Sequence, residues 1–294
     1  IIADSTCDIS KEDARKMGIQ IVPISVRFGD EEFLDGVEIT HEEFYTRLAE
    51  CDELPKTSQP SPDTFMKVFN EAVAAGDDVL GIFISSDLSG TYQSACLAAL
   101  DVEEETRKKL YMVDSRSASI GTALLIREAV KLRDAGVNVS DIAAACTEMS
   151  KYIKLTAVVG SLKYLKMGGR LSGAAAFAGT MLHITPVVSI EDGKVVVIGK
   201  TRGKKAAEKL MHDKLIKDGL SLTRDFMFGH INCSESLETF INKSLTYISD
   251  VNGNVGVSSI GCSVGTHVGP GTYGIAYVEA AESGMNRESI VKTA

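Results

Sequence analysis

Residues 79–90, VLGIFISSDLSG, decide the fold class of this chain. Val79–Ile84 is a short apolar run, typical of a strand that is buried on both faces. Ser85–Gly90 then forms a polar loop, and a helix is predicted from Thr91 to about Leu100. A strand, a loop and a helix in this order, repeated along a chain, indicate a parallel sheet with helices on both faces.

The same unit occurs twice more in the first half of the chain. Ile1–Ala3 is apolar and ends at the polar residues Asp4–Asp8, and Leu110–Val113 ends at Asp114 and Ser115. In parallel sheets, ligands lie at the carboxyl ends of the strands. We therefore expect a site where these polar loops meet.

Two further patterns complete the first half. Ile19–Phe28 is predicted to be one strand at an edge or with a bulge, because Pro23 lies inside it. Ser61 followed by Pro62 predicts the start of a helix.

After about residue 160 the pattern changes to a mixed one. Val187–Ile190 and Lys194–Ile198 flank the turn Glu191-Asp192-Gly193, which indicates an antiparallel hairpin. A charged helix is predicted over Lys204–Lys217, followed by alternating strands and helices. We predict an N-terminal α/β domain over 1–160 and a mixed α/β domain over 161–294, with a ligand between them.

Composition excludes several classes of protein. The 294 residues carry 31 Lys and Arg against 40 Asp and Glu, a net charge of −9, so we expect no nucleic-acid partner. The stretch Leu171–Ile190 carries no charged residue over about the length that a membrane span requires. Its Gly, Ser, His and Pro residues instead favour a buried helix followed by a strand. We therefore expect no membrane span, and the start of the chain shows no pattern of a secretory signal.

Cysteine and histidine spacing predicts neither disulfides nor a metal site. The six cysteines are scattered with no Cys-x-x-Cys, and the five histidines lack the usual metal-binding spacings. We expect free thiols, no metal, no cofactor and a location in the reducing cytoplasm.

Three motifs resemble catalytic or nucleotide-binding signatures and are rejected. Gly261–Gly265 matches a nucleophile elbow, but we expect Gly269-Pro270-Gly271 to prevent the required helix, and no acid lies between Ser263 and His267. Gly269–Gly274 matches a dinucleotide loop but precedes a strand. Gly199-Lys200-Thr201 lacks the upstream glycine of a phosphate loop at the required spacing.

Four polar clusters remain as candidates for a binding site. Ser85–Gly90 and Thr57–Ser61 each precede a helix, where N–H groups and the helix dipole attract an anion, although Ser89 is equally suited to be a helix cap. Gly168–Ser172 places an Arg in a glycine-rich turn, and Gly265–Gly271 places a His among glycines. Together these clusters predict an anion site at the edge of the sheet.

The order of these clusters resembles the DegV family. The resemblance extends over the whole chain and rests on five collinear pieces: Asp4-Ser5-Thr6-Cys7-Asp8, Thr57-Ser58-Gln59-Pro60-Ser61, Ser89-Gly90-Thr91-Tyr92-Gln93-Ser94-Ala95, Gly168-Gly169-Arg170-Leu171-Ser172 and Gly265-Thr266-His267-Val268-Gly269-Pro270-Gly271. It implies a two-domain bacterial protein that binds a long-chain fatty acid between its domains.

The resemblance also implies a role and a set of residues. Such proteins present the carboxylate to a separate kinase subunit, related to dihydroxyacetone kinases, and the acyl phosphate product feeds phospholipid synthesis. The protein itself is then a lipid-binding subunit with no catalytic residue. The carboxylate would be held by Thr57 and Ser89, and the whole predicted binding set is Thr57, Ser58, Ser89, Gly90, Arg170 and His267.

Uncharged hydroxyl donors leave a carboxylate nucleophilic, so we expect Arg170 and His267 to assist the incoming phosphoryl group more than they hold the acid. The main alternative is an autonomous acyl- or phosphoryl-transfer enzyme that uses Ser89 or His267. A regulator is a third possibility, disfavoured by the charge and by the lack of a helix-turn-helix pattern. The basic helix over Lys204–Lys217 is a candidate kinase-docking surface.

Overall fold

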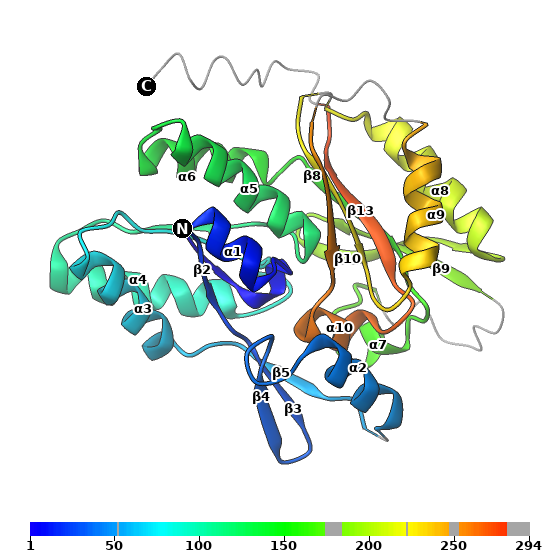
Figure 1. The fold of residues 1–294 in the computed structure, drawn as a ribbon, viewed down its shortest axis with the longest axis horizontal. Helices are drawn as coiled ribbons and strands as arrows, with labels where there is room; N and C mark the ends of the chain where they lie inside the picture. The colour runs from blue at the N-terminus through cyan, green and yellow to red at the C-terminus, as the bar shows by residue number, and fades with distance from the viewer. Residues whose placement is uncertain (52, 174–183, 222, 247–252, 281–294) are drawn as a thin grey trace.

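The computed structural model describes residues 1–51, 53–173, 184–221, 223–246 and 253–280 (Figure 1). Within these residues the strands form sheets of four, six and three strands. The α/β class is confirmed. The helix expected after Leu171 falls largely on residues outside the described ones.

The four-stranded sheet is parallel, as predicted. β1 pairs with β2 and β6, and β6 pairs with β7, so the order is β2-β1-β6-β7. All four residues of β6 are buried, as expected for a central parallel strand. The bounds are β1 Ile2–Asp4, β2 Gln20–Val22, β6 Leu80–Phe83 and β7 Tyr111–Asp114.

Helices cover both faces of this sheet. On one face Phe83 belongs to a buried cluster with Phe65 and Phe69 of α3 and with apolar residues of α4. On the other face Ile82 belongs to a cluster that includes residues of α1, α5 and α6. Ser61 caps α3 as predicted, since its Oγ accepts the N–H of Thr64 at 3.2 Å. The bounds are α1 Lys11–Met17, α3 Pro62–Ala74, α4 Thr91–Thr106, α5 Ile120–Asp134 and α6 Val139–Met149.

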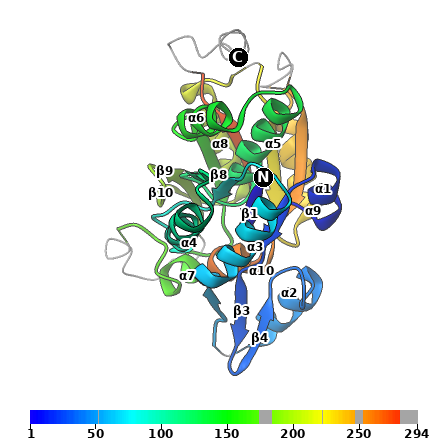
Figure 2. The same cartoon turned by 90° about the vertical axis from the view of Figure 1, so that its left-hand side faces the viewer.

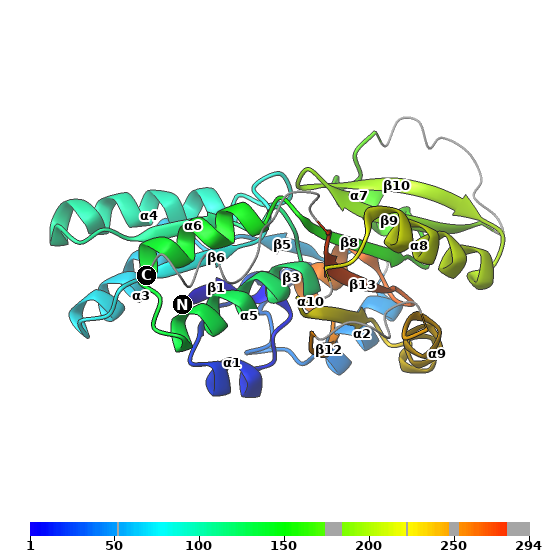
Figure 3. The same cartoon turned by 90° about the horizontal axis from the view of Figure 1, so that it is seen from above.

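The six-stranded sheet is mixed, in the order β10-β9-β8-β13-β11-β12. Its pairs are antiparallel except β11 with β12, and the predicted hairpin is β9–β10. In Figure 3, α3 and α4 lie at the end of the molecule far from β9 and β10. The bounds are β8 Ile153–Val158, β9 Thr185–Glu191, β10 Lys194–Thr201, β11 Phe226–His230, β12 Val255–Ser259 and β13 Tyr273–Val278.

The two faces of this sheet have different partners. α8 (Lys204–Asp218) and α9 (Ser234–Ser244) cover the outer face, around a core that includes Phe228 and Phe240. α5 packs against β8, β11 and β13 on the inner face, so α5 contacts elements of both large sheets. The division predicted between residues 160 and 161 stays a prediction; β8 precedes it and belongs to the six-stranded sheet.

A small antiparallel sheet corrects one prediction. β3 (Ser25–Phe28) pairs with β4 (Glu31–Leu34) and β5 (Lys56–Ser58), and Figure 2 shows β3, β4 and α2 projecting from the rest of the fold. The single strand expected over Ile19–Phe28 is therefore wrong. It divides at Pro23, which has no N–H for a ladder, and β2 and β3 lie in different sheets. Helix α2 is His41–Glu50.

A short helix corrects another prediction. α10 (Cys262–Val268) follows β12, although we expected the glycines nearby to prevent a helix. Position 265, inside this helix, requires glycine because a side chain there would overlap the ring of Tyr45. Gly269, with φ of +75°, ends the helix instead of preventing it.

Candidate functional site

A cavity lies between the carboxyl ends of β1 and β6 and the inner face of the six-stranded sheet. Its volume is about 150 Å³. Part of its apolar wall comes from alternate residues of β8 and β9, which pair across the sheet as Leu155 with Ile190 and Ala157 with Val188. The alternation of a strand puts all four side chains on one face. An elongated apolar ligand fits such a wall.

Polar side chains gather at another part of the same cavity. Thr57, Ser89, Arg170 and His267 all line it, and they come from β5, the loop before α4, the turn after α7 (Lys163–Met167) and α10. The structure therefore brings together four of the six residues predicted to bind the ligand. The loop carrying Ser89 follows β6, as the parallel-sheet argument predicted.

Thr57 and His267 form a hydrogen-bonded pair. The Oγ1 of Thr57 lies 2.9 Å from Nε2 of His267, whose Nδ1 is buried without a partner among the described residues. Burial, with a smaller contribution from the nearby charge of Arg170, lowers the pKa of His267 to about 4. The imidazole is therefore neutral at pH 7. When Nε2 carries the proton, it donates to Thr57 and leaves the threonine O–H free to donate to a ligand.

Ser89 lies beside the start of α4 without being its cap. The N-cap residue is Gly90, and the Oγ of Ser89 accepts the N–H of Thr91 at 3.3 Å. The Oγ of Ser89 is also 2.9 Å from the Oγ1 of Thr91, which is buried. If the Thr91 hydroxyl donates in this pair, the Ser89 O–H can donate into the cavity.

Arg170 is half-buried and held by backbone oxygens. Its Nη1 donates to the carbonyl of Gly168 at 2.6 Å, and its Nε donates to the carbonyl of Leu88 at 3.2 Å. The second bond joins the turn after α7 to the loop that carries Ser89. Among the described residues Arg170 has no acidic partner, so its charge is available to an anion in the cavity.

The other two predicted residues do not line the cavity. Ser58 is exposed, because successive side chains of β5 point to opposite faces and Thr57 points inward. Gly90 packs against Gln59, which does line the cavity, and a side chain at Gly90 would overlap the Gln59 amide. Gly90 thus acts through close packing.

Sequence reasoning missed Gln59 and Ser263 as cavity residues. Gln59 stands inside the Thr57–Ser61 cluster, so its position was a usable signal. Ser263 is 3 % exposed, and its Oγ has no partner among the described residues. It lies in the motif rejected as a nucleophile elbow, and its place on the first turn of α10 explains how it reaches the cavity.

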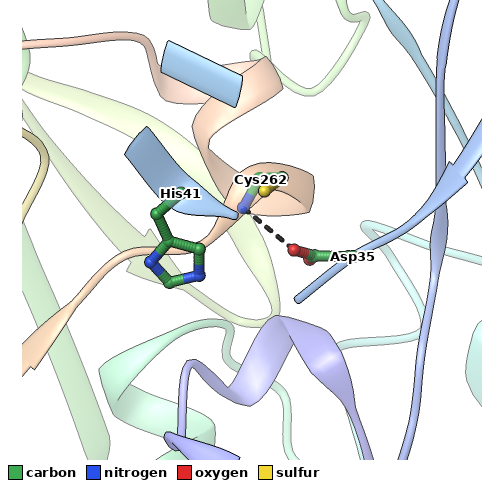
Figure 4. A group of neighbouring side chains, drawn as sticks. All are labelled: Asp35, His41 and Cys262. Carbon is green, nitrogen blue, oxygen red and sulfur yellow. Dashed lines mark hydrogen bonds between the residues drawn. The ribbon is translucent and has the colours of Figure 1, made fainter. Parts of the chain in front are cut away.

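A different group of side chains, Asp35, His41 and Cys262, lies at the opposite end of α10 from His267 (Figure 4). The six cysteines are free thiols, as predicted; three of them are buried: Cys7, Cys146 and Cys262. Among the described residues, no helix combines the length and the apolar character needed to cross a membrane.

Comparison with known proteins gives consistent matches over most of the chain. A family profile described as an uncharacterised protein of the DegV family matches residues 1–280. A DegV domain-containing protein of Clostridium perfringens is 35 % identical over 288 residues, covering 95 % of this chain and 98 % of the relative.

Solved structures match as well. A DegV family protein of Thermus thermophilus, described as binding fatty acid, has a TM-score of 0.84 and 30 % identity, covering 95 % of this chain and 98 % of the other. A stearic acid-binding protein of Eubacterium ventriosum has a TM-score of 0.83 and 29 % identity, covering 95 % and 97 %.

Proposed function

This chain belongs to the DegV family, and we propose that it binds a long-chain fatty acid and presents the carboxylate to a separate kinase subunit. One observation carries the proposal: a single cavity is lined both by apolar side chains and by the polar group of Thr57, Ser89, Arg170 and His267. The fatty acids bound by the solved relatives support the same ligand class.

The tail supplies most of the binding free energy. Each methylene removed from water contributes about 0.8 kcal/mol, so ~14 methylenes contribute roughly 11 kcal/mol before the costs of ordering the ligand. The wall formed by Leu155, Ala157, Val188 and Ile190 provides the apolar surface for this transfer. Affinity therefore depends mainly on how much of the tail fits.

The head group sets the orientation of the acid. Thr57 and Ser89 offer hydroxyl donors, and each hydrogen bond to a carboxylate contributes about 1.5–3 kcal/mol, which offsets part of its desolvation. Neutral His267 acts on the acid through Thr57, with which it pairs. The carboxylate keeps its nucleophilic character because neutral donors hold it.

The geometry favours a carrier over an autonomous transferase. An enzyme using Ser89 as nucleophile needs a base within hydrogen-bond reach. Among the described residues, Ser89 pairs with Thr91 and His267 pairs with Thr57, so the two are not a nucleophile and base pair. In this proposal the kinase subunit, related to dihydroxyacetone kinases, binds ATP and transfers its γ-phosphoryl group to the carboxylate, releasing ADP, and the acyl phosphate enters phospholipid synthesis in the cytoplasm.

Native mass spectrometry of the purified protein tests the ligand class. We expect one fatty acid per chain, identified by gas chromatography of the extracted lipid. A sugar or a nucleotide in its place contradicts the proposal, as does failure to take up added oleate.

A second experiment tests the role of a carrier. The protein is incubated with ATP and oleate, with and without the kinase subunit. Acyl phosphate should form only with the kinase subunit. Its formation by this chain alone would favour the enzyme alternative.

A further inference from the structure

Asp35, His41 and Cys262 come from three different elements and meet at the start of α10. Asp35 follows β4, His41 is the first residue of α2, and Cys262 is the first residue of α10. One carboxylate oxygen, one ring nitrogen and the Sγ atom all lie within 4.8 Å of one another. Figure 4 shows His41 and Asp35 on opposite sides of Cys262. Asp35 and Cys262 are buried and His41 is half-buried.

Gly261 brings the backbone close to these groups. The position that a side-chain carbon of Gly261 would take is 3.0 Å from Oδ1 of Asp8, 3.1 Å from Nε2 of His41 and 3.5 Å from Oδ1 of Asp35. A side chain at position 261 would crowd these atoms, so glycine lets the backbone approach them closely. Metal bonds to oxygen and nitrogen are about 2.0–2.2 Å long, so the three donor atoms, now within 4.8 Å of one another, must move closer together to bind one ion.

The surroundings favour a cation. Asp8 and Asp35 are 7 % and 4 % exposed, and within the described part of the chain neither carboxylate has a Lys or Arg at ion-pair distance. A bound cation would compensate the desolvated Asp35 carboxylate.

Asp35 is already oriented by hydrogen bonds. The backbone N–H groups of Cys262 and Ser263 donate to its two oxygens at 3.2 and 3.1 Å, and the Ser5 hydroxyl donates at 3.2 Å. Carboxylates that ligate metals are normally held in this way by surrounding donors. A carboxylate has about four lone-pair positions, so Asp35 keeps one for a metal.

We propose that Asp35, His41 and Cys262 bind one divalent transition-metal ion with the ligand preferences of Zn²⁺. Thiolate and imidazole donors favour zinc over magnesium or calcium, which prefer oxygen alone. Asp35 and His41 also line a groove on the surface, so water can occupy the fourth position. This site is separate from the fatty-acid cavity and does not depend on the function proposed for it.

Metal binding at this site releases a proton. The Sγ–metal bond forms as the S–H bond of Cys262 breaks, and the proton leaves to the buffer. We therefore expect affinity to increase with pH and one proton to be released for each ion bound.

Titration of the metal-free full chain with Zn²⁺ and Co²⁺ tests the site. We expect one ion per chain, with a thiolate-to-cobalt absorption band that is absent in Cys262→Ser. His41→Ala should weaken binding at least tenfold, and because His41 is half-buried at a helix start, this variant should fold even if Cys262→Ser does not.

A matched control comes from a second Cys–His pair in the chain. The N–H of Cys233 donates to Nδ1 of His230 at 3.4 Å, and Cys233→Ser should leave zinc binding unchanged. The proposal is overturned if the wild-type chain binds no zinc, if His41→Ala binds it as tightly as the wild type, or if only Cys233→Ser removes it.

Discussion

The Oγ1 of Thr57 and the Nε2 of His267 lie 2.9 Å apart, although 210 positions separate them in the chain. Thr57 belongs to the small sheet and His267 to α10, so the pair joins two parts of the fold at the polar end of the cavity. The neutral imidazole orients the threonine hydroxyl, and the hydroxyl can then bind the acid.

Thr57→Val should weaken fatty-acid binding by roughly ten- to a hundredfold, the equivalent of one hydrogen bond to a charged group. Val keeps the shape of the side chain and removes the donor. Displacement of a fluorescent fatty acid measures the change. Ser58→Ala is the matched control, because the neighbouring side chain on β5 is exposed, and it should bind as the wild type does. Equal losses in both variants would contradict the assignment.

His267 should make the protein sensitive to acid. Its folded-state pKa of about 4 lies below the value of about 6.5 in the unfolded chain, so below pH 6.5 the unfolded state takes up a proton that the folded state does not. This group therefore does not reduce the free energy of unfolding above pH 6.5, and the free energy of unfolding decreases as the pH falls from 6.5 to 4. The loss is on the order of 3 kcal/mol at 1.36 kcal/mol per pKa unit.

Urea unfolding of wild type and His267→Gln between pH 7 and 4.5 checks this expectation. The free energy of unfolding should fall more steeply with acid in the wild type, because Gln does not titrate. Parallel curves would mean that His267 is not protected from protonation in the folded protein.

Ala157→Leu should shorten the space for the tail. Ala157 lines the cavity and is paired with Val188 across the sheet, so a larger side chain occupies volume where methylenes would lie. We expect the affinity for the longest acids to fall relative to that for shorter ones, measured over a chain-length series. Val257→Leu adds bulk on the exposed face of β12 and should leave the series unchanged. A uniform loss at every length would instead indicate general unfolding.

Arg170→Gln should separate binding from phosphoryl transfer. Arg170 bonds to two backbone carbonyls and leaves its charge near the head group, where it can meet the incoming phosphate. We expect less than about a tenfold loss of oleate affinity, equal to 1.4 kcal/mol, and a larger loss of acyl phosphate formed with the kinase subunit. Arg116→Gln removes a charge that pairs with Asp192 at the surface and serves as the control. A greater effect on binding than on transfer would contradict this role.

Local pattern predicted much of the fold. The apolar run Val79–Ile84 and the polar loop after it correctly identified a central parallel strand and an edge of the sheet that adjoins a cavity. The division of the strand at Pro23 was missed, because a proline within an apolar run is equally compatible with a bulge and with a change of sheet. α10 was missed because glycine was treated as a helix breaker, whereas packing against Tyr45 requires it.

The candidate site was only partly predicted, because strand register and tertiary packing decide which side chains reach it. Four residues were identified from clusters of polar residues, but which of Thr57 and Ser58 faces inward depends on the pairing register of β5. Asp35, His41 and Cys262 have no spacing that indicates a metal, since the last lies 227 positions after the first. Only the packing of α10 against α2 and the loop after β4 brings them together.

The shortness of α10 has a consequence for communication within the molecule. Its seven residues span roughly 10 Å at 1.5 Å per residue, with Cys262 at one end and His267 at the other. If an ion bound at Cys262 displaced this short helix, His267 would be displaced with it. Thermodynamic reciprocity would then require the ion to change the affinity for the fatty acid by the same factor as the fatty acid changes the affinity for the ion.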